Sequence, residues 1–565
     1  MKNYALIEIP KYENMRDMVD GVCTQYAERN AYSYREGAGN PPMVTVTYAK
    51  LHEDVRALAT EMRARGYAGK HCVCVGRLSY PWIVTYMATI AAGAVFIPLD
   101  RDWTAADLAS TVERADTAVV FYDADLGEER AEAVLAVGSV ETSYLLSTAT
   151  DAENTVFSLV EAGKARREAG DRAWEESKID PDATASIVFT SGTTGKGKGV
   201  MLSSRNILSN VHSALSFFTM SMRSMAVLPP HHTFGSTINL LGHLGGGSEL
   251  YLSRGLRYIQ NELKTERPGH MVMVPLYLET FYRKIWANIR EQGKEKLVKN
   301  MMKLCNVLHL PTPIRRKMFS SILAAFGGRI DFVVTGGAPI NSEIANAYET
   351  WGVKIINGYG ITECAPLVAA NRNKIRVQGS VGFPVPCNEV YIAEPNEDGE
   401  GEIRVKGENV MQGYYKDPEA TAEVFDDKGY FCTGDYGKLD KDGLLYITGR
   451  KKNLIILSNG KNVYPEEIEA ELSGVPGVLD IIVYEGESRR GPEYNAIVAE
   501  IFPDKEYFEK NANEDVKAYF QGFVDQYNRT CTPYKKISIL RVRDTEFPKN
   551  TLRKIQRFRL DRSID

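Results

Sequence analysis

The sequence has few cysteines and no pattern that would pair them. Eight cysteines occur in 565 residues; Cys72 and Cys74 are separated by one residue, no C-x-x-C cluster occurs, and the others are scattered. This spacing excludes a disulfide framework and a zinc site built on cysteines, and it indicates reduced thiols in a cytoplasmic protein. The N-terminus also lacks an apolar stretch followed by small residues, so secretion is not expected.

The chain has no excess of positive charge, no internal repeats and no low-complexity tracts. Its net charge of -5 gives no reason to expect nucleic acid as a partner. Hydrophobic residues at 44% and charged residues at 25% are typical of a soluble globular protein. One hydrophobic core rarely exceeds roughly 250 to 300 residues, so the length predicts two or three domains.

One uncharged run, residues 79–99, is long enough to cross a bilayer. Gly93 and Pro98 interrupt it, and its flanks are those of a soluble protein. We predict a buried helix over roughly residues 81–92, followed by a short strand over residues 94–97 that ends at Pro98. No transmembrane segment is therefore expected.

Short apolar runs alternate with helical stretches over most of the chain. The runs HCVCVG, TAVVFYD, ASIVFT, MAVLPP, HMVMVP, DFVVTGG and VKIINGYG predict an α/β fold with largely parallel sheets. Beyond about residue 385, strand pairs around Asp-Gly turns predict a small antiparallel, barrel-like part. After Arg450, KNVYPEEIEAELSG predicts a helix that starts near Pro465. We expect a large domain over residues 1–449 and a small, mobile α+β domain over residues 450–565.

A glycine-rich loop, TSGTTGKGKG at residues 190–199, separates a predicted strand from a helix predicted to begin at Val200. From Gly192 it matches a P-loop, except that Gly199 stands where Ser or Thr would bind Mg²⁺. Glycines let the backbone approach an anion, hydroxyls donate hydrogen bonds and lysines add positive charge. The loop therefore predicts phosphate binding, although taken alone it is equally typical of a solvated turn.

Three later motifs distinguish these alternatives: GYGITECAP, GYFCTGDYGKLDKDGLLYITGRKKNLIILSNGKNVYPEEIE and FPKNTLRKIQR follow in this order. With them the sequence resembles, over nearly its whole length, the adenylate-forming superfamily of acyl-CoA synthetases, luciferases and peptide-synthetase adenylation domains. The resemblance implies an AMP-forming acid-thiol ligase. Such an enzyme uses ATP and Mg²⁺ to convert a carboxylic acid to acyl-AMP with release of pyrophosphate, then transfers the acyl group to CoA with release of AMP.

The resemblance implies that the 190–199 loop is a lid over the β- and γ-phosphates of ATP. Its implied phosphate contacts are Ser191, Thr193, Thr194 and Lys198. Gly197 replaces the proline that is usual in the family, a change that adds backbone freedom.

Further nucleotide contacts are implied by the other motifs. Thr362 is expected to bind the α-phosphate and Glu363 to hold Mg²⁺, in agreement with the need for a carboxylate that the loop lacks. Asp435 suits a vicinal diol because a carboxylate accepts two O–H bonds, and it is expected at the ribose together with Arg450. The residues implied near adenine and the acyl group are Gly336, Gly337, Ala338, Asn357, Gly358 and Tyr359.

Lys554 is similar in position to the catalytic lysine of the family. Joining a carboxylate to the α-phosphorus brings two anions together, so positive charge is the main need of the reaction. The motif departs from the family at Asn550 and Arg553, and a solvated basic tail is the alternative. Lys452 matches the hinge on which the small domain would rotate. Gly460 lies in the segment implied to approach the large domain during thioester formation.

The acid is indicated less directly. His232 in LPPHHTFG matches the gate beside the acyl site, where it would position the substrate, and His231 is expected to be a bystander. HHTFGSTINLLGHLGGG has no acidic residue to pair with an ammonium, which disfavours amino acids and fits a hydrocarbon chain. Residues 282–330, basic and amphipathic, resemble a helical segment of long-chain acyl-CoA synthetases and fit either a packed helical hairpin or a membrane-contacting surface. We expect a medium- or long-chain fatty acid.

Other functions stay open at this point. The acceptor is either CoA or the phosphopantetheine of an acyl carrier protein, and an enzyme that stops at acyl-AMP has the same motifs. A catalytically silent nucleotide-binding scaffold predicts loss of Glu363, Asp435, Arg450 or Lys554, and all four are present. A luciferase-type oxygenase shares the first step, but no motif points to it.

Overall fold

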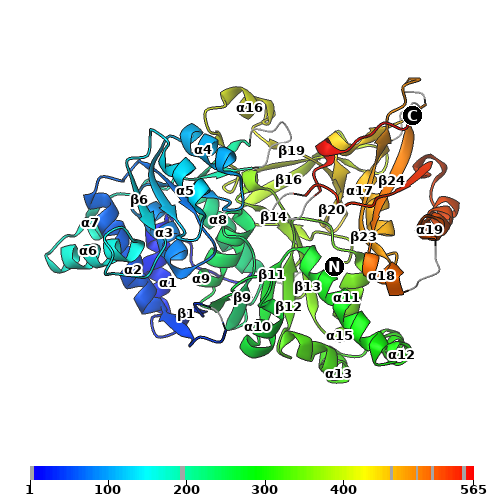
Figure 1. The fold of residues 1–565 in the computed structure, drawn as a ribbon, viewed down its shortest axis with the longest axis horizontal. Helices are drawn as coiled ribbons and strands as arrows, with labels where there is room; N and C mark the ends of the chain where they lie inside the picture. The colour runs from blue at the N-terminus through cyan, green and yellow to red at the C-terminus, as the bar shows by residue number, and fades with distance from the viewer. Residues whose placement is uncertain are drawn as a thin grey trace.

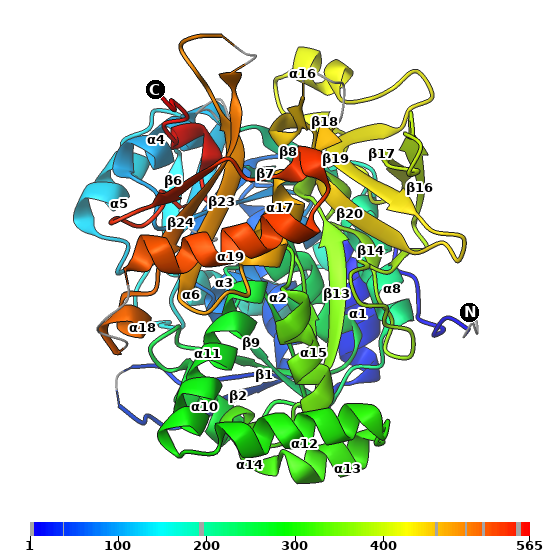
Figure 2. The same ribbon diagram turned by 90° about the vertical axis from the view of Figure 1, so that its right-hand side faces the viewer.

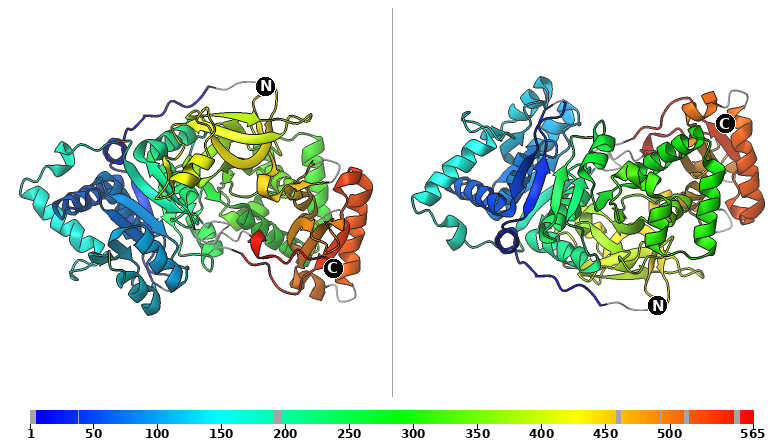
Figure 3. Two further views of the ribbon diagram at one scale, coloured as in Figure 1. Left: turned by 90° about the horizontal axis from the view of Figure 1, so that it is seen from above. Right: turned by 90° about the horizontal axis from the view of Figure 1, so that it is seen from below.

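The computed structural model describes residues 5–37, 39–190, 197–457, 462–491, 494–510, 515–549 and 555–565. Two large mixed sheets and a smaller antiparallel sheet make up a large N-terminal domain, and a smaller C-terminal domain lies at the opposite end of the molecule from the first helices (Figures 1 and 3). The α/β prediction is confirmed.

The first sheet has seven strands in the order β18-β8-β7-β4-β3-β5-β6. Its centre is parallel, and β8 and β18 add an antiparallel edge. The strands are β3 (His71–Val75), β4 (Val95–Leu99), β5 (Thr117–Tyr122), β6 (Thr142–Leu145), β7 (Thr184–Phe189), β8 (Gly199–Ser203) and β18 (Gly413–Tyr414). The helices of this region are α1 (Met15–Gln25), α2 (Tyr48–Ala64), α3 (Tyr80–Ala91), α4 (Ala105–Arg114), α5 (Glu128–Leu135), α6 (Val156–Glu168) and α7 (Ala173–Glu176).

The uncharged run forms the predicted helix, which is α3, and the predicted strand, which is β4 of this sheet. The twelve residues of α3 are all buried, and no helix among the described residues is long and apolar enough to cross a membrane. The expected end of the strand at Pro98 is wrong, because β4 runs through Pro98 to Leu99. Only Phe96 of β4 pairs with β7, so the missing N–H of Pro98 leaves no hydrogen bond unmade on that side.

The helix predicted from Val200 begins four residues later. Residues 199–203 form β8, which pairs antiparallel with β7 as the second arm of a hairpin. The helix α8 (Ser204–Phe217) follows, with Ser203 as its N-cap in a capping box with Asn206. The apolar residues after the loop therefore belong to a strand, because pairing with β7 decides their conformation.

The second sheet has nine strands in the order β15-β14-β13-β12-β11-β9-β10-β1-β2, parallel from β1 to β13 and antiparallel at both edges. The strands are β1 (Asn30–Tyr34), β2 (Val44–Thr47), β9 (Arg223–Ala226), β10 (Glu249–Leu252), β11 (His270–Met273), β12 (Phe332–Thr335), β13 (Lys354–Gly360), β14 (Leu367–Ala370) and β15 (Phe383–Pro384).

Helices cover both faces of this sheet. On one face α8 and the π-helix η1 (Phe234–Leu241) pack on Val272, Val334 and Ile356; α9 (Gly242–Gly245) follows η1. On the other face lie α10 (Ile259–Glu266), α11 (Pro275–Glu291) and α15 (Ser342–Trp351), which contact Met271, Met273 and Val333. The predicted helical segment continues as α12 (Glu295–Val307), α13 (Thr312–Met318), α14 (Ser320–Leu323) and the 3₁₀ turn η2 (Ala324–Phe326), at the lower edge of Figure 2.

The remaining elements confirm the predicted change after residue 385. β16 (Asn388–Ala393), β17 (Gly401–Gly407), β19 (Phe431–Leu439) and β20 (Leu445–Arg450) form an antiparallel sheet, with α16 (Pro418–Glu423) between β18 and β19. The C-terminal domain contains β21 (Ile455–Ile456), β22 (Asn462–Val463), α17 (Pro465–Leu472), β23 (Val478–Gly486), β24 (Ala496–Pro503), α18 (Lys505–Lys510), α19 (Val516–Thr530) and β25 (Ile539–Val542). It contacts the large domain where Asn341 Nδ2 donates to Ser473 Oγ at 3.2 Å.

Candidate active site

Two neighbouring parallel strands carry the segments expected near adenine. Thr335, at the end of β12, lies opposite Asn357 in β13, and residues 336–338 follow β12 directly. A Cβ added to Gly336 would lie 2.8 Å from the carbonyl oxygen of Gly358, so the two backbones approach too closely for a side chain. Gly337 has a φ of +83°, and it is exposed together with Ala338. Clefts for ligands in α/β folds form at this carboxyl end of parallel strands.

Glu363 lies in the 3₁₀ turn η3 (Thr362–Cys364) that follows β13. Its Oε1 accepts a 2.9 Å hydrogen bond from Tyr414 Oη, and Lys198 Nζ lies 4.6 Å from the centre of the Tyr414 ring. Burial and the nearby carboxylate raise the pKa of Tyr414, so the phenol stays protonated and donates. The structure thus brings Lys198 and Glu363 together around a tyrosine that sequence reasoning missed.

The described end of the glycine-rich loop is closely packed. Thr190 N donates to Lys198 O at 3.0 Å, and Arg114 Nη1 donates to Gly197 O at 3.0 Å. A Cβ on Gly197 would lie 2.2 Å from Thr190 O, so this arrangement admits no side chain there. Gly197, which stands where the family usually has proline, therefore lies too close to the backbone of Thr190 to carry a side chain.

Asp435 is a buried carboxylate held by both of its oxygens. It is 2% exposed and lies opposite Arg450 in the β19-β20 ladder, with Arg450 Nε 2.9 Å from Oδ1. Tyr359 Oη, from β13, donates to Oδ2 at 2.5 Å. Burial and the adjacent carboxylate raise the pKa of Tyr359, and the carboxylate raises that of Arg450. A carboxylate has about four lone-pair positions, so two remain for another ligand.

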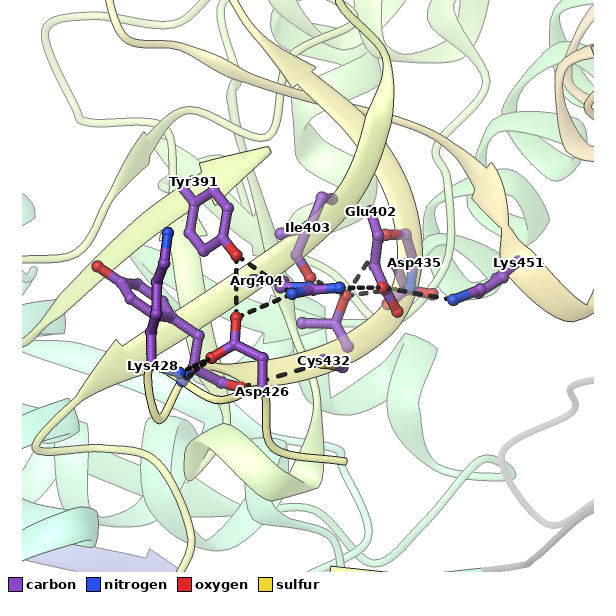
Figure 4. Close-up of polar contacts among 11 residues, drawn as sticks. Tyr391, Glu402, Ile403, Arg404, Asp426, Lys428, Cys432, Asp435 and Lys451 are labelled. Atoms are coloured by element: carbon purple, nitrogen blue, oxygen red, sulfur yellow. Dashed lines mark hydrogen bonds and ion pairs between the residues drawn. The ribbon is translucent and has the colours of Figure 1, made fainter. Parts of the chain in front are cut away.

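The segment predicted to be the hinge follows β20, and a chain of ion pairs connects its first residue to the antiparallel sheet, as Figure 4 shows. Lys451 Nζ lies 3.4 Å from Glu402 Oε2, and Arg404 bridges Glu402 and Asp426 at 3.4 and 2.8 Å. Lys452 follows in the 3₁₀ turn η4 (Lys451–Asn453), where partial desolvation and the positive charge of Arg450 lower its pKa. The partly exposed ion pair between Lys451 and Glu402 joins the first residue after β20 to the large domain.

His232 lies just before η1, where its carbonyl oxygen accepts a 2.9 Å hydrogen bond from Ser236 N. A Cβ on Gly336 would be 3.9 Å from Phe234 Cζ, so this segment adjoins the loop after β12. The neighbouring His231 ring lies 4.2 Å from that of His232, and its Nε2 is 3.5 Å from Asp100 Oδ2. Burial lowers the pKa of His231 to about 4, so the ring is neutral at pH 7. His231 makes a buried contact that the bystander expectation omitted.

The helix beyond His232 is not uniformly apolar. The His243 ring stacks on His270 at 4.8 Å, and His270 stacks on Phe332 at 4.8 Å. Burial lowers the pKa of His243 to about 4 and that of His270 well below its usual value. Within the described part of the chain, the two polar side-chain atoms of Asn239 and the Nε2 atoms of His243 and His270 have no hydrogen-bond partner. Sequence reasoning missed this polar group, whose one signal is the Asn in an otherwise apolar INLL segment.

Several expected residues, namely Ser191, Thr193, Thr194, Gly460 and Lys554, lie outside the described residues. The chain on either side of Lys554 is nevertheless paired, which is unlike a solvated basic tail. Lys549 Nζ lies 2.6 Å from Asp480 Oδ2, and Arg557 Nη2 donates to both oxygens of Glu469 at 2.6 Å. Among the described residues no group of three or more His, Cys, Asp or Glu side chains is arranged for a metal.

The chain is similar in sequence to known proteins. The model of the AMP-binding enzyme family matches residues 20–415. Rat long-chain-fatty-acid-CoA ligase 5 is 28% identical over 83% of this chain and 72% of its own. The chloroplastic long-chain-fatty-acid-[acyl-carrier-protein] ligase AEE15 of Arabidopsis thaliana is 27% identical over 87% of this chain and 77% of its own.

Solved structures share the fold. ATP-bound MatB from Rhodopseudomonas palustris has a TM-score of 0.73 at 24% identity and covers 96% of this chain and 97% of its own. The anthranilate CoA ligase AuaEII in complex with anthranoyl-AMP has a TM-score of 0.75 at 18% identity and covers 97% of both chains.

Proposed function

Because the chain belongs to the AMP-binding enzyme family, we propose that it joins a carboxylic acid to a thiol by way of an acyl-adenylate. The observation that carries the proposal is the buried Asp435, which is held between Tyr359 and Arg450 and is suited to accept both hydroxyls of a ribose. We assign Asp435 and Glu363 to one site, because Tyr359 lies near the end of β13 and η3 follows that strand directly.

In the first step a carboxylate oxygen of the acid attacks the α-phosphorus, and the bond from that phosphorus to the bridging oxygen breaks to release pyrophosphate. The proposed roles are α-phosphate binding for Thr362, β- and γ-phosphate binding for the loop ending at Lys198, and stabilisation of the reacting anions for Lys554. No general base is needed, because the acid is already ionised.

Glu363 is the residue that fits Mg²⁺. It is a half-buried carboxylate whose orientation is held by Tyr414, and Lys198 lies over the ring of the same tyrosine. The ion would neutralise charge on the phosphates; the protein's part is to hold the carboxylate in place.

In the second step the sulfur of a thiol attacks the acyl carbon, the bond to the AMP oxygen breaks, and the thiol proton leaves. We propose that residues 450–565 form the domain that rotates between the steps on Lys452, with Gly460 near the thiol. CoA is the proposed acceptor. An acyl carrier protein is the alternative, and relatives named for each acceptor are of similar identity.

The proposed acid is a medium- or long-chain fatty acid. Its support is the apolar cluster of Phe234, Ile238, Val272 and Val334 beside His232, together with the names of the relatives. Pyrophosphate release measured over acids of increasing chain length tests this choice, and a preference for short or aromatic acids would contradict it.

ATP-pyrophosphate exchange tests the activity itself. We expect exchange with at least one acid, and none with any acid would overturn the proposal in favour of a silent scaffold. Lys554→Ala should abolish adenylate formation while largely sparing thioester formation from supplied acyl-AMP. Equal loss of both steps would contradict the role of Lys554.

A further inference from the structure

The outer face of α12 exposes large apolar side chains. Leu297 and Leu308 are each 58% exposed, Leu304 is 48% exposed, and Val307 is 65% exposed. Ile314, on the neighbouring α13, is 47% exposed. Isolated exposed apolar residues are common on soluble proteins, but a group on adjoining helices marks an interaction site.

The spacing shows that these leucines do not serve the core. Leu297, Leu304 and the C-cap residue Leu308 are seven and four residues apart, so they lie along one stripe of the helix and its C-terminal end. A different side of α12 packs on the core cluster below the second sheet, through Val298, Met301, Met302 and Cys305. The helix is thus apolar on its packed side and again along an exposed stripe.

Lysines border the exposed stripe. Lys296 and Lys303 are exposed and lie about a quarter turn from the leucines. Residues 290–318 contain eight lysines and arginines against two glutamates, in a chain whose net charge is -5. Only part of this charge is neutralised nearby, as where Lys299 Nζ lies 2.8 Å from Glu295. The surface is therefore both apolar and positive.

We propose that this leucine-lysine face, formed by the exposed stripe of α12 with Ile314 and the bordering lysines, docks on the surface of an anionic lipid bilayer. Leucines would enter the boundary between headgroups and acyl chains, and the long lysine side chains would reach the phosphates. The site is at the periphery, where α12 and α13 lie side by side at the lower edge of Figure 2.

The positive charge of this face favours an anionic bilayer over a second copy of the chain as its partner. Two copies meeting through this face would bring two positive surfaces together, which is unfavourable. An anionic bilayer instead complements both the leucines and the lysines. The proposal does not depend on the activity proposed above, so each can fail without the other.

Flotation with lipid vesicles tests the proposal. The full chain should float with phosphatidylcholine vesicles that contain phosphatidylglycerol, and added salt or omission of the anionic lipid should weaken the binding. The paired changes Leu304→Gln with Leu308→Gln, and Lys296→Gln with Lys303→Gln, should each lower binding by at least about tenfold. Leu256→Gln is the control, because Leu256 is 66% exposed and lies between β10 and α10, outside the leucine-lysine face.

Thermal unfolding should be the same for all variants, since each altered side chain is exposed. The proposal is overturned if the unaltered chain does not float, if it floats equally with neutral vesicles, or if the paired variants bind as well as the control. A dimer in size-exclusion chromatography that the leucine pair dissociates would assign the face to a second copy and would also overturn it.

Discussion

Removing the carboxylate of Asp435 should weaken ATP binding, chiefly by the loss of its hydrogen bonds to the ribose. Asp435 accepts from Tyr359 and Arg450, which leaves about two lone-pair positions for the 2′- and 3′-hydroxyls. A hydrogen bond to a charged group contributes about 1.5 to 3 kcal/mol, so two contribute roughly 3 to 6 kcal/mol. With 1.4 kcal/mol per factor of ten, Asp435→Ala should raise the KM for ATP by about 10² to 10⁴. Asp435→Asn keeps one acceptor and should give a smaller increase.

The decisive assay pairs this variant with an altered nucleotide. In ATP-pyrophosphate exchange, 2′,3′-dideoxy-ATP should be a poor substrate for the unaltered chain and almost as good as ATP for Asp435→Ala. Such non-additivity is the sign of a direct contact. Asp440→Ala is the control, because the Asp440 carboxylate accepts backbone N–H groups of Asp442 and Leu444 in a turn beyond β19. If dideoxy-ATP and Asp435→Ala weaken binding independently, Asp435 does not bind the ribose.

Three other substitutions test the electrostatics of the molecule. Tyr414→Phe removes the hydrogen bond to Glu363 and should raise the Mg²⁺ concentration needed for half-maximal exchange by about tenfold. Burial, opposed by Arg557, raises the pKa of Glu469 from 4.5 to about 7. Because the folded state holds this proton more tightly than the unfolded state, the stability that Glu469 contributes is fully present below pH 4.5 and is lost as pH rises through about 7. Glu469→Gln should remove this fall, up to about 3 kcal/mol, in urea unfolding measured across that range. Asn239→Leu removes two buried polar atoms without partners among the described residues and should raise the unfolding free energy by about 1 to 3 kcal/mol.

Each of these tests has a control or a contrary result. Tyr415→Phe, which loses a bond to Asp116 instead, should leave the Mg²⁺ requirement unchanged. A Glu469→Gln variant with the same pH dependence as the unaltered chain would place the titrating group elsewhere. If Asn239→Leu instead destabilises the fold, the side-chain amide of Asn239 is hydrogen-bonded to bound water or to a ligand.

Local patterns were enough to predict several elements. The hairpins β16-β17 and β19-β20 were found from Asp-Gly turns between alternating strands, and α3 from an uncharged run ended by glycine. Two local predictions failed at β8 and at Pro98. In both, the neighbouring strand decided the conformation, and that neighbour cannot be read from the segment itself.

The same distinction between local patterns and distant partners applies to the residues of the candidate site. The resemblance carried by the motifs implied roles for Glu363, Asp435 and Arg450. It did not indicate Tyr414, which is 51 residues from Glu363, nor the hydrogen bond between Tyr359 and Asp435 across 76 residues. The helical pattern of α12 likewise showed an amphipathic basic segment without showing which apolar residues stay exposed.

By itself the sequence determined which chemical groups are available and which segments form helices and strands, because both follow from residue types within short stretches. Tertiary structure alone decided which groups meet, which carboxylates are buried and oriented, and which leucines remain in solvent. The physical reason is that hydrogen bonds, burial and pKa depend on partners brought from distant segments by sheet pairing and helix packing.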